Sequence, residues 1–97
     1  MKIFRKQKSD PELVTSGYFE LEREDLVATL QYTIAGQVLG LVHTEIPGAL
    51  RGTGVGSTLV QTALDWAREH QMKIDVVCPF VAAYLQSHPE YSDLILR

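Results

Sequence analysis

The chain has 97 residues, of which 45% are hydrophobic and 22% charged, and its formal net charge is −3. A chain of this length buries one modest core, and this composition is that of a globular protein rather than a disordered or fibrous one. Because a mildly acidic chain lacks the clustered positive charge that nucleic-acid binding requires, we expect no nucleic-acid partner.

The first twelve residues are rich in lysine, glutamine, serine and aspartate. They predict a loose terminus or a short edge strand at the start of one domain that fills residues 1–97. This stretch lacks the apolar core of a signal peptide, and no apolar run in the chain approaches the ~18 residues of a membrane span. We therefore expect no membrane partner and a cytoplasmic location.

Alternating apolar and polar residues predict three strands, over residues 17–23, 26–34 and 37–46. The second strand would present one apolar face, made of Leu26, Ala28, Leu30, Tyr32 and Ile34. Turns at residues 24–25 and 35–36 join consecutive strands closely. The first half of the chain is therefore predicted to be an antiparallel meander.

The third predicted strand ends in polar residues. Strict alternation places one set on one face: Leu39, Leu41, His43 and Glu45. The other face would then carry Val38, Val42, Thr44 and Ile46. His43 and Glu45 would point the same way with their Cβ atoms ~6.5 Å apart, close enough to act on one small reacting group.

Residues 55 to about 70 carry apolar side chains at helical spacing, which predicts an amphipathic helix. The β-branched run at residues 73–78 predicts a short strand, and a strand reached through a helix implies a parallel pair with a right-handed crossover. Ligands favour the carboxyl ends of such strands. Pro79 then opens a short helix that ends by Leu85, and residues 91–97 could add a last strand.

The segment from Arg51 to Ser57 joins the third strand to the long helix. Its three glycines remove side chains where a backbone must approach a ligand and permit positive φ angles, so consecutive N–H groups can converge on one anion. The helix dipole adds to this attraction. The pattern predicts a phosphate or pyrophosphate site, and the alternative is an ordinary strand-to-helix turn.

A meander, an RxxGxG loop that opens a helix, a strand, and a short helix bearing a tyrosine together resemble the GNAT superfamily of acetyl-CoA-dependent N-acetyltransferases. Four segments are similar to its small stand-alone YjdJ-type branch: residues 43–47, 51–56, 78–80 and 89–91. The similarity covers residues 17–93. It implies a minimal GNAT-like α/β (α+β) fold whose two parallel strands splay apart.

The resemblance implies acetyl-CoA as the cofactor. In GNAT proteins the glycine-loop amides hold the CoA pyrophosphate, and that role here falls on Arg51, Gly52, Thr53, Gly54, Val55, Gly56 and Ser57. Pantetheine would lie between the splayed strands, against Thr44, Glu45 and Ile46, with Tyr84 close by. The helical segment that usually shapes the acceptor pocket is missing, so the amine acceptor is either large, such as a protein amine, or bound by a homodimer.

Acetyl transfer to an amine needs a base for the amine proton and hydrogen-bond donors for the tetrahedral oxyanion, and preferably an acid for the departing thiolate. Glu45 is the most GNAT-like base, directly or through water, and the alternative is a solvated strand-end carboxylate. His43 could share that role because an ordinary histidine titrates near neutral pH, or it could be structural. Tyr84 would donate to the leaving sulfur, or it would only pack against Phe80.

Cys78, the single cysteine, excludes an internal disulfide and suits a reducing compartment, and no residue pattern offers a zinc site. A free cysteine is often a small buried hydrophobe. At the start of a helix, however, a thiolate is favoured, and an acetyl-cysteine intermediate becomes possible. For the whole chain the alternatives to an enzyme are a CoA-binding sensor or interaction module without turnover, and a scaffold that binds no CoA.

Overall fold

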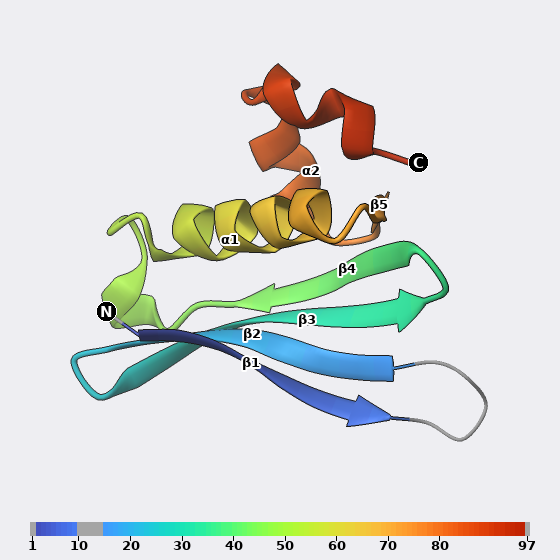
Figure 1. The fold of residues 1–97 in the computed structure, drawn as a ribbon. Helices are drawn as coiled ribbons and strands as arrows, with labels where there is room; N and C mark the ends of the chain where they lie inside the picture. Colours follow the sequence, from blue (N-terminus) through green and yellow to red (C-terminus); the bar gives the residue numbers. More distant parts are fainter. Residues whose placement is uncertain (1, 10–14, 97) are drawn as a thin grey trace.

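A computed structural model describes residues 2–9, by their backbone, and residues 15–96 in full. The chain forms a single five-stranded sheet with the strands in sequence order (Figure 1). The strands are β1 (Lys2–Ser9), β2 (Thr15–Arg23), β3 (Leu26–Ala35), β4 (Val38–Glu45) and β5 (Lys73–Val76). The first four pair antiparallel, and β4 and β5 pair parallel.

Two α-helices follow the meander: α1 (Val55–Glu69), between β4 and β5, and α2 (Pro79–Gln86). Two short 3-10 turns complete the chain, η1 (Gly48–Leu50) and η2 (Pro89–Leu94). The predicted fold class, an antiparallel meander followed by a parallel β-α-β unit and a short C-terminal helix, is confirmed. The N-terminal stretch supplies an edge strand, and residues 1 and 10–12 of it lie outside the described residues.

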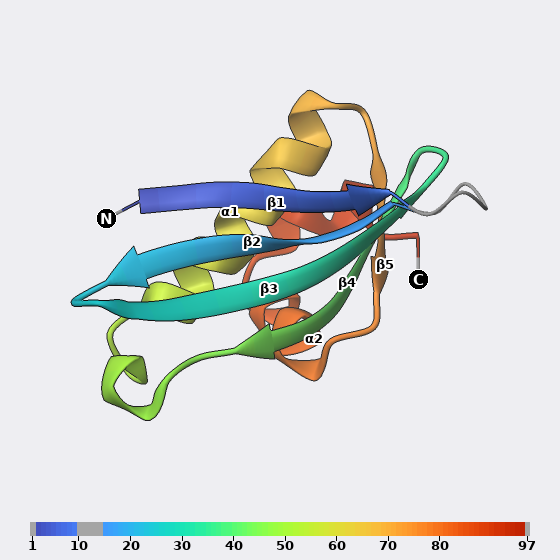
Figure 2. The same ribbon diagram turned by 90° about the horizontal axis from the view of Figure 1, so that it is seen from below.

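The helices cover only one face of the sheet. Alternate residues of β3 point toward α1 and are fully buried, as the sequence pattern predicted, among them Ala28, Leu30 and Tyr32. The buried face of α1 packs on them with Val55, Gly56, Leu59, Val60, Ala63, Leu64 and Ala67. Figure 2 looks onto the opposite face of the sheet, which no helix of the described chain covers.

A β-bulge interrupts β4 and changes which of its residues face the core. Gln31 lies opposite His43, but the next residue, Tyr32, lies opposite Leu41, so Val42 is an extra residue on β4. Beyond a bulge the alternation of side chains starts again in a new phase. The predicted faces of β4 are therefore wrong at its end: His43 and Glu45 do not share the face of Leu41.

The predicted last strand at residues 91–97 is also wrong. Residues 89–94 form the turn η2, and the only sheet-like contact recorded in this segment of the described chain is a parallel bridge between Ile74 and Ile95. The strand predicted over residues 73–78 ends at Val76. Side chains explain why the tail turns, because hydrogen bonds between α1 and η2 hold residues 89–94 in the turn.

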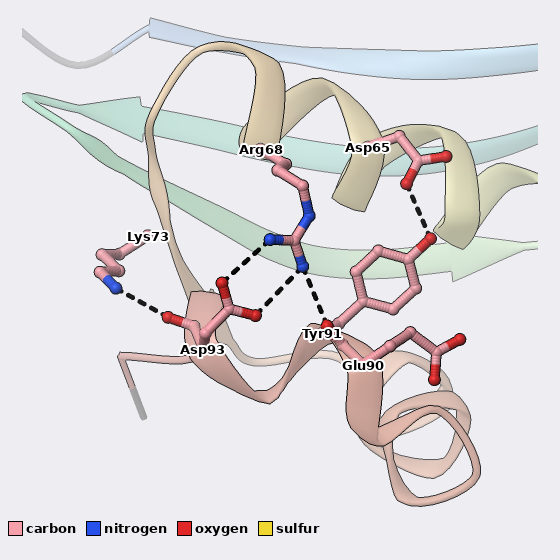
Figure 3. A network of polar contacts seen from close by, with 6 residues as sticks. All are labelled: Asp65, Arg68, Lys73, Glu90, Tyr91 and Asp93. Atoms are coloured by element: carbon pink, nitrogen blue, oxygen red, sulfur yellow. Dashed lines mark hydrogen bonds and ion pairs between the residues drawn. The ribbon is translucent and has the colours of Figure 1, made fainter.

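These hydrogen bonds belong to the polar network of Figure 3. Arg68 of α1 donates two hydrogen bonds to the Asp93 carboxylate, at 2.9 and 3.1 Å, and one to the Glu90 carbonyl oxygen at 2.9 Å. The Tyr91 hydroxyl donates to Asp65 at 2.7 Å. The Arg68 guanidinium, through its hydrogen bond and charge, lowers the pKa of Asp93 below its usual value.

Candidate functional site

The parallel strands separate at their carboxyl ends. Pairing between β4 and β5 runs from Val38 to Leu41, and the amides of Val77 and Cys78 then both donate to the Leu41 carbonyl oxygen. Strand β4 continues to Glu45, pairing only with β3 among the described strands. The end of β4 therefore borders an opening between the two strands, where GNAT-like splaying was predicted.

The glycine loop follows this opening and leads into α1. Gly52 and Gly54 have φ angles of 77° and 87°, in the left-handed region that favours glycine. Within residues 15–96, the backbone amides at positions 52 and 54–57 donate no hydrogen bond to a backbone carbonyl oxygen. The first amide of α1 that does so is that of Thr58. Five unpaired donors thus lie on consecutive parts of the loop and the first turn of α1.

These amides border a cavity of about 420 Å³. Its lining comprises Thr44, Ile46, Leu50, Arg51, Gly52, Gly54, Val55, Gly56, Ser57 and Phe80. Unpaired amides at a helix N-terminus, beside the exposed Arg51, are suited to an anion such as a pyrophosphate. The residues present therefore fit the phosphate end of CoA. We call this space the glycine-loop cavity.

Thr53 belongs to the predicted cofactor set but does not line this cavity. Its hydroxyl and its amide both donate to the Leu50 carbonyl oxygen, at 2.5 and 3.3 Å. Thr53 therefore closes the turn that carries the glycines. Conversely, the sequence assigned no site role to Leu50 or Phe80, since an apolar side chain in a turn or a short helix carries no signal of its own.

Ile46 and Phe80 meet over Gly56. A Cβ atom placed on Gly56 would lie 2.5 Å from Ile46 Cδ1 and 2.6 Å from Phe80 Cζ. Only a glycine at the start of α1 allows these two side chains to approach the helix so closely. They form the apolar wall of the cavity where β4 and α2 come together.

A second cavity, of about 400 Å³, lies at the end of β4, and we call it the strand-end cavity. It is lined by His43, Thr44, Glu45, Ile46 and Arg51. The side chains of His43 and Glu45 are 59% and 75% exposed, and His43 Nε2 lies 3.4 Å from Glu45 Oε1. The prediction that they point the same way is confirmed, although toward the uncovered face of the sheet.

Three residues line both cavities: Thr44, Ile46 and Arg51. The unpaired amides of the glycine loop and the His43–Glu45 pair thus border adjoining cavities, which share a wall formed by the end of β4, the residue after it and the start of the loop. Within the described residues no group of three or more His, Cys, Asp or Glu side chains is placed to hold a metal ion.

Cys78 lies behind this shared wall. Its side chain is only 3% exposed, and it lines neither of the two cavities. Its sulfur lies 3.2 Å from Thr44 Oγ1, a distance at which either atom can donate. Its backbone caps α2, because the Ala82 amide donates to its carbonyl oxygen at 3.1 Å.

Tyr84 also lies outside the walls of both cavities. Its ring stacks on His88 with centroids 3.8 Å apart, and the two planes differ by only 6°. Burial, helped by the charges of Glu90 and Asp65, raises the pKa of the Tyr84 phenol. The phenol is therefore protonated at neutral pH, as a hydrogen-bond donor must be.

Comparison with known proteins agrees with this geometry. The family model described as GCN5-related N-acetyl-transferase matches residues 18–94, more than half of the chain. The chain belongs to this GNAT family. The match covers most of β2, all of β3, β4 and β5, the glycine loop, both helices and η2, whereas the YjdJ-type branch stays a prediction.

Individual GNAT relatives match over part of their length. Protein NATD1 of Gallus gallus and Protein NATD1 of Mus musculus are each 35% identical to this chain over 63 residues, which are 64% of this chain and 57% of the relative. Protein NATD1 of Danio rerio is 32% identical over 73 residues, 72% of this chain and 66% of the relative. The chain thus spans less than two thirds of these relatives.

A solved structure shares the fold over nearly the whole chain. The NMR solution structure of a GCN5-like protein from Staphylococcus aureus superposes with a TM-score of 0.64 at 25% sequence identity. It covers 94% of this chain, and 87% of that protein is matched.

The described part of this chain contains no helix both long enough and apolar enough to cross a membrane.

Proposed function

We propose that this GNAT protein binds acetyl-CoA through the glycine loop and transfers the acetyl group directly to an amine. The observation that carries the proposal is the shared wall between the two cavities. Five unpaired amides border one cavity, and the His43–Glu45 pair borders the other. Binding of the donor and removal of a proton are therefore arranged side by side.

On the binding side, the residues from Arg51 to Ser57 would hold the pyrophosphate, with Thr53 shaping the turn. A hydrogen bond to a charged group contributes about 1.5–3 kcal/mol, so several such bonds supply the ~8 kcal/mol of a micromolar complex. Backbone donors do this without clustered basic side chains. The acidic net charge of the chain is therefore compatible with an anionic ligand.

On the chemical side, CoA supplies the acetyl group as an activated thioester. Glu45, directly or through water, would accept the proton of the incoming amine, and His43 would share the proton across their 3.4 Å contact. Tyr84 would donate to the departing sulfur if ligand binding brings it to the opening. The burial of Cys78 supports direct transfer over an acetyl-cysteine route.

The acceptor is proposed to be an amine that reaches an open site. Because the side chains of His43 and Glu45 are more than half exposed on the uncovered sheet face (Figure 2), a large substrate such as a protein amine can approach without entering a deep pocket. A homodimer that completes the strand-end cavity, where the amine would bind, is the second arrangement compatible with this openness. The free thiol suits a reducing compartment, so the proposal includes a cytoplasmic location.

Glu45→Gln tests the catalytic part of this proposal. Loss of the carboxylate should lower the rate of acetyl transfer ~10²-fold or more while leaving acetyl-CoA affinity nearly unchanged. Release of free CoA thiol, measured with a panel of small amines and lysine-containing peptides, would follow turnover, and calorimetry would follow binding. Glu22→Gln, at an exposed position of β2, is the control with the same charge change.

A binding module without turnover is the rival function. Tight acetyl-CoA binding by the unmodified protein with no transfer to any amine of the panel would favour that module. Equal turnover by the Glu45→Gln protein would remove Glu45 from the mechanism.

A further inference from the structure

Thr44 occupies the point where the two cavities meet. It lies opposite Leu30, which is fully buried, so its side chain is on the inward face of β4. The bulge at Val42 is what brings it there, while His43 and Glu45 turn outward. Thr44 therefore places a hydroxyl on the side of β4 that faces the glycine-loop cavity. Its two neighbours along the chain, His43 and Glu45, are the residues proposed to accept the proton.

The Thr44 hydroxyl contacts the side chain of Cys78. The Cys78 amide donates to the Leu41 carbonyl oxygen at 2.9 Å, and its carbonyl oxygen accepts from the Ala82 amide at 3.1 Å. Bonds on both sides thus hold this residue, and its sulfur lies 3.2 Å from Thr44 Oγ1. The hydroxyl of the half-buried Thr44 is consequently in contact with a residue whose backbone is held in place.

Either group can donate in this contact, and their chemistry favours one direction when a carbonyl oxygen lies in the opening. A hydroxyl has one proton to donate and two lone pairs, whereas a thiol is both a weak donor and a weak acceptor. If the thiol donates to Thr44 Oγ1, the hydroxyl proton is free to point into the opening. A carbonyl oxygen there is a far better acceptor than sulfur, so this arrangement satisfies all three groups.

We propose that Thr44 donates a hydrogen bond to the acetyl carbonyl oxygen and that Cys78 is a positioning residue that orients it. The inference rests on the proposed function. The amine nitrogen bonds to the carbonyl carbon, its proton passes to the His43–Glu45 pair, and the carbon–sulfur bond breaks with its electron pair on the leaving sulfur. Thr44 stabilises the charge that develops on oxygen, and no bond forms to Cys78.

The test compares affinities for acetyl-CoA and for CoA, because only the former has the carbonyl oxygen. Calorimetry of the Thr44→Val protein should show acetyl-CoA binding weakened about three- to tenfold relative to CoA, the effect of one hydrogen bond. Thr44→Ser should restore the wild-type ratio. Thr62→Val is the matched control, because the Thr62 hydroxyl donates to the Thr58 carbonyl oxygen on α1.

Two variants of Cys78 test its role as a positioning residue. Cys78→Ser keeps a donor behind Thr44 and should keep the affinity ratio, whereas Cys78→Ala should lower it about twofold or more. An unchanged ratio in Thr44→Val, with both ligands still bound, would overturn the inference while leaving the proposed function intact. An acetyl group found on Cys78 by mass spectrometry would also overturn it, and failure of the unmodified protein to bind CoA would instead contradict the proposed function.

Discussion

At the scale of single residues, Gly54 carries the greatest conformational demand of the glycine loop. Its φ angle of 87° is left-handed, and it immediately precedes the first residue of α1. A side chain at this position costs about 1–2 kcal/mol because its Cβ crowds the following carbonyl oxygen. The backbone would relieve that strain by rotating, which would redirect the neighbouring amides away from a common ligand.

We therefore expect Gly54→Ala to weaken acetyl-CoA binding at least tenfold, measured by calorimetry, and to lower the free energy of unfolding by about 1 kcal/mol. Gly36→Ala is the matched control, because Gly36 has a φ angle of 59°, lies in the turn between β3 and β4, and also has empty space around its Cβ position. It should lose similar stability and no affinity. Equal affinity losses in both proteins would show that the effect is global.

The residues of the glycine loop could be predicted because their spacing alone implies their backbone geometry. The role of Thr53 in closing the turn and the approach of Phe80 to Gly56 could not, because both depend on contacts between side chains and distant backbone. The inward position of Thr44 belongs to the same class. These features depend on tertiary contacts rather than on local composition.

At the scale of elements, β4 shows why alternation alone misplaced two catalytic candidates. The pattern correctly predicted three paired strands, the long helix and the parallel strand after it. A bulge, however, adds one residue to one strand only. It is recognised from the register between β3 and β4, which the sequence of β4 alone does not specify. The side chains beyond Val42 therefore lie on faces opposite to those predicted.

The turn between β2 and β3 holds two acidic residues in a conformation that suits asparagine and glycine. Glu24 and Asp25 have φ angles of 53° and 64°. We expect Asp25→Gly to raise the free energy of unfolding by about 1 kcal/mol, because a glycine adopts this conformation without the Cβ clash. Urea denaturation would measure it. Glu22→Gly, in the extended backbone of β2, should instead lower stability, and a stabilising result there would contradict the explanation.

The attachment of η2 to α1 should be visible in stability at high pH. Burial, and then the hydrogen bond to Asp65, raises the pKa of Tyr91 to about 12. Since an unfolded tyrosine titrates near ~10, the folded state prefers the protonated phenol, and that stabilisation is complete below ~pH 10 and is lost as the pH rises toward the folded value.

Tyr91→Phe should therefore lower the free energy of unfolding at neutral pH by about 1 kcal/mol, through the lost hydrogen bond, and should weaken the fall in stability between ~pH 10 and 12. Denaturant unfolding across this range would measure both effects. Tyr18→Phe, at an exposed tyrosine of β2, is the control and should change neither. An unaltered pH profile in Tyr91→Phe would assign the alkaline instability to other groups.

At the scale of the whole molecule, the proposed choice of acceptor depends on the uncovered face of the sheet. The glycine-loop cavity is bordered by α1, α2 and the glycine loop, while the His43–Glu45 pair points toward the sheet face that Figure 2 shows uncovered. This asymmetry suits a small donor held firmly and an acceptor that arrives as part of something larger. Light scattering with and without acetyl-CoA would show whether a second copy covers the face instead.

The most direct test of the central claim is a nuclear magnetic resonance titration of the ¹⁵N-labelled protein with acetyl-CoA. We predict that the amide signals of residues 52 and 54–57 shift most, accompanied by those of residues 44–46, while signals of the turn at residues 35–36 stay unchanged. Shifts confined to other parts of the chain, or none at millimolar ligand, would contradict the assignment of the glycine loop as the CoA site.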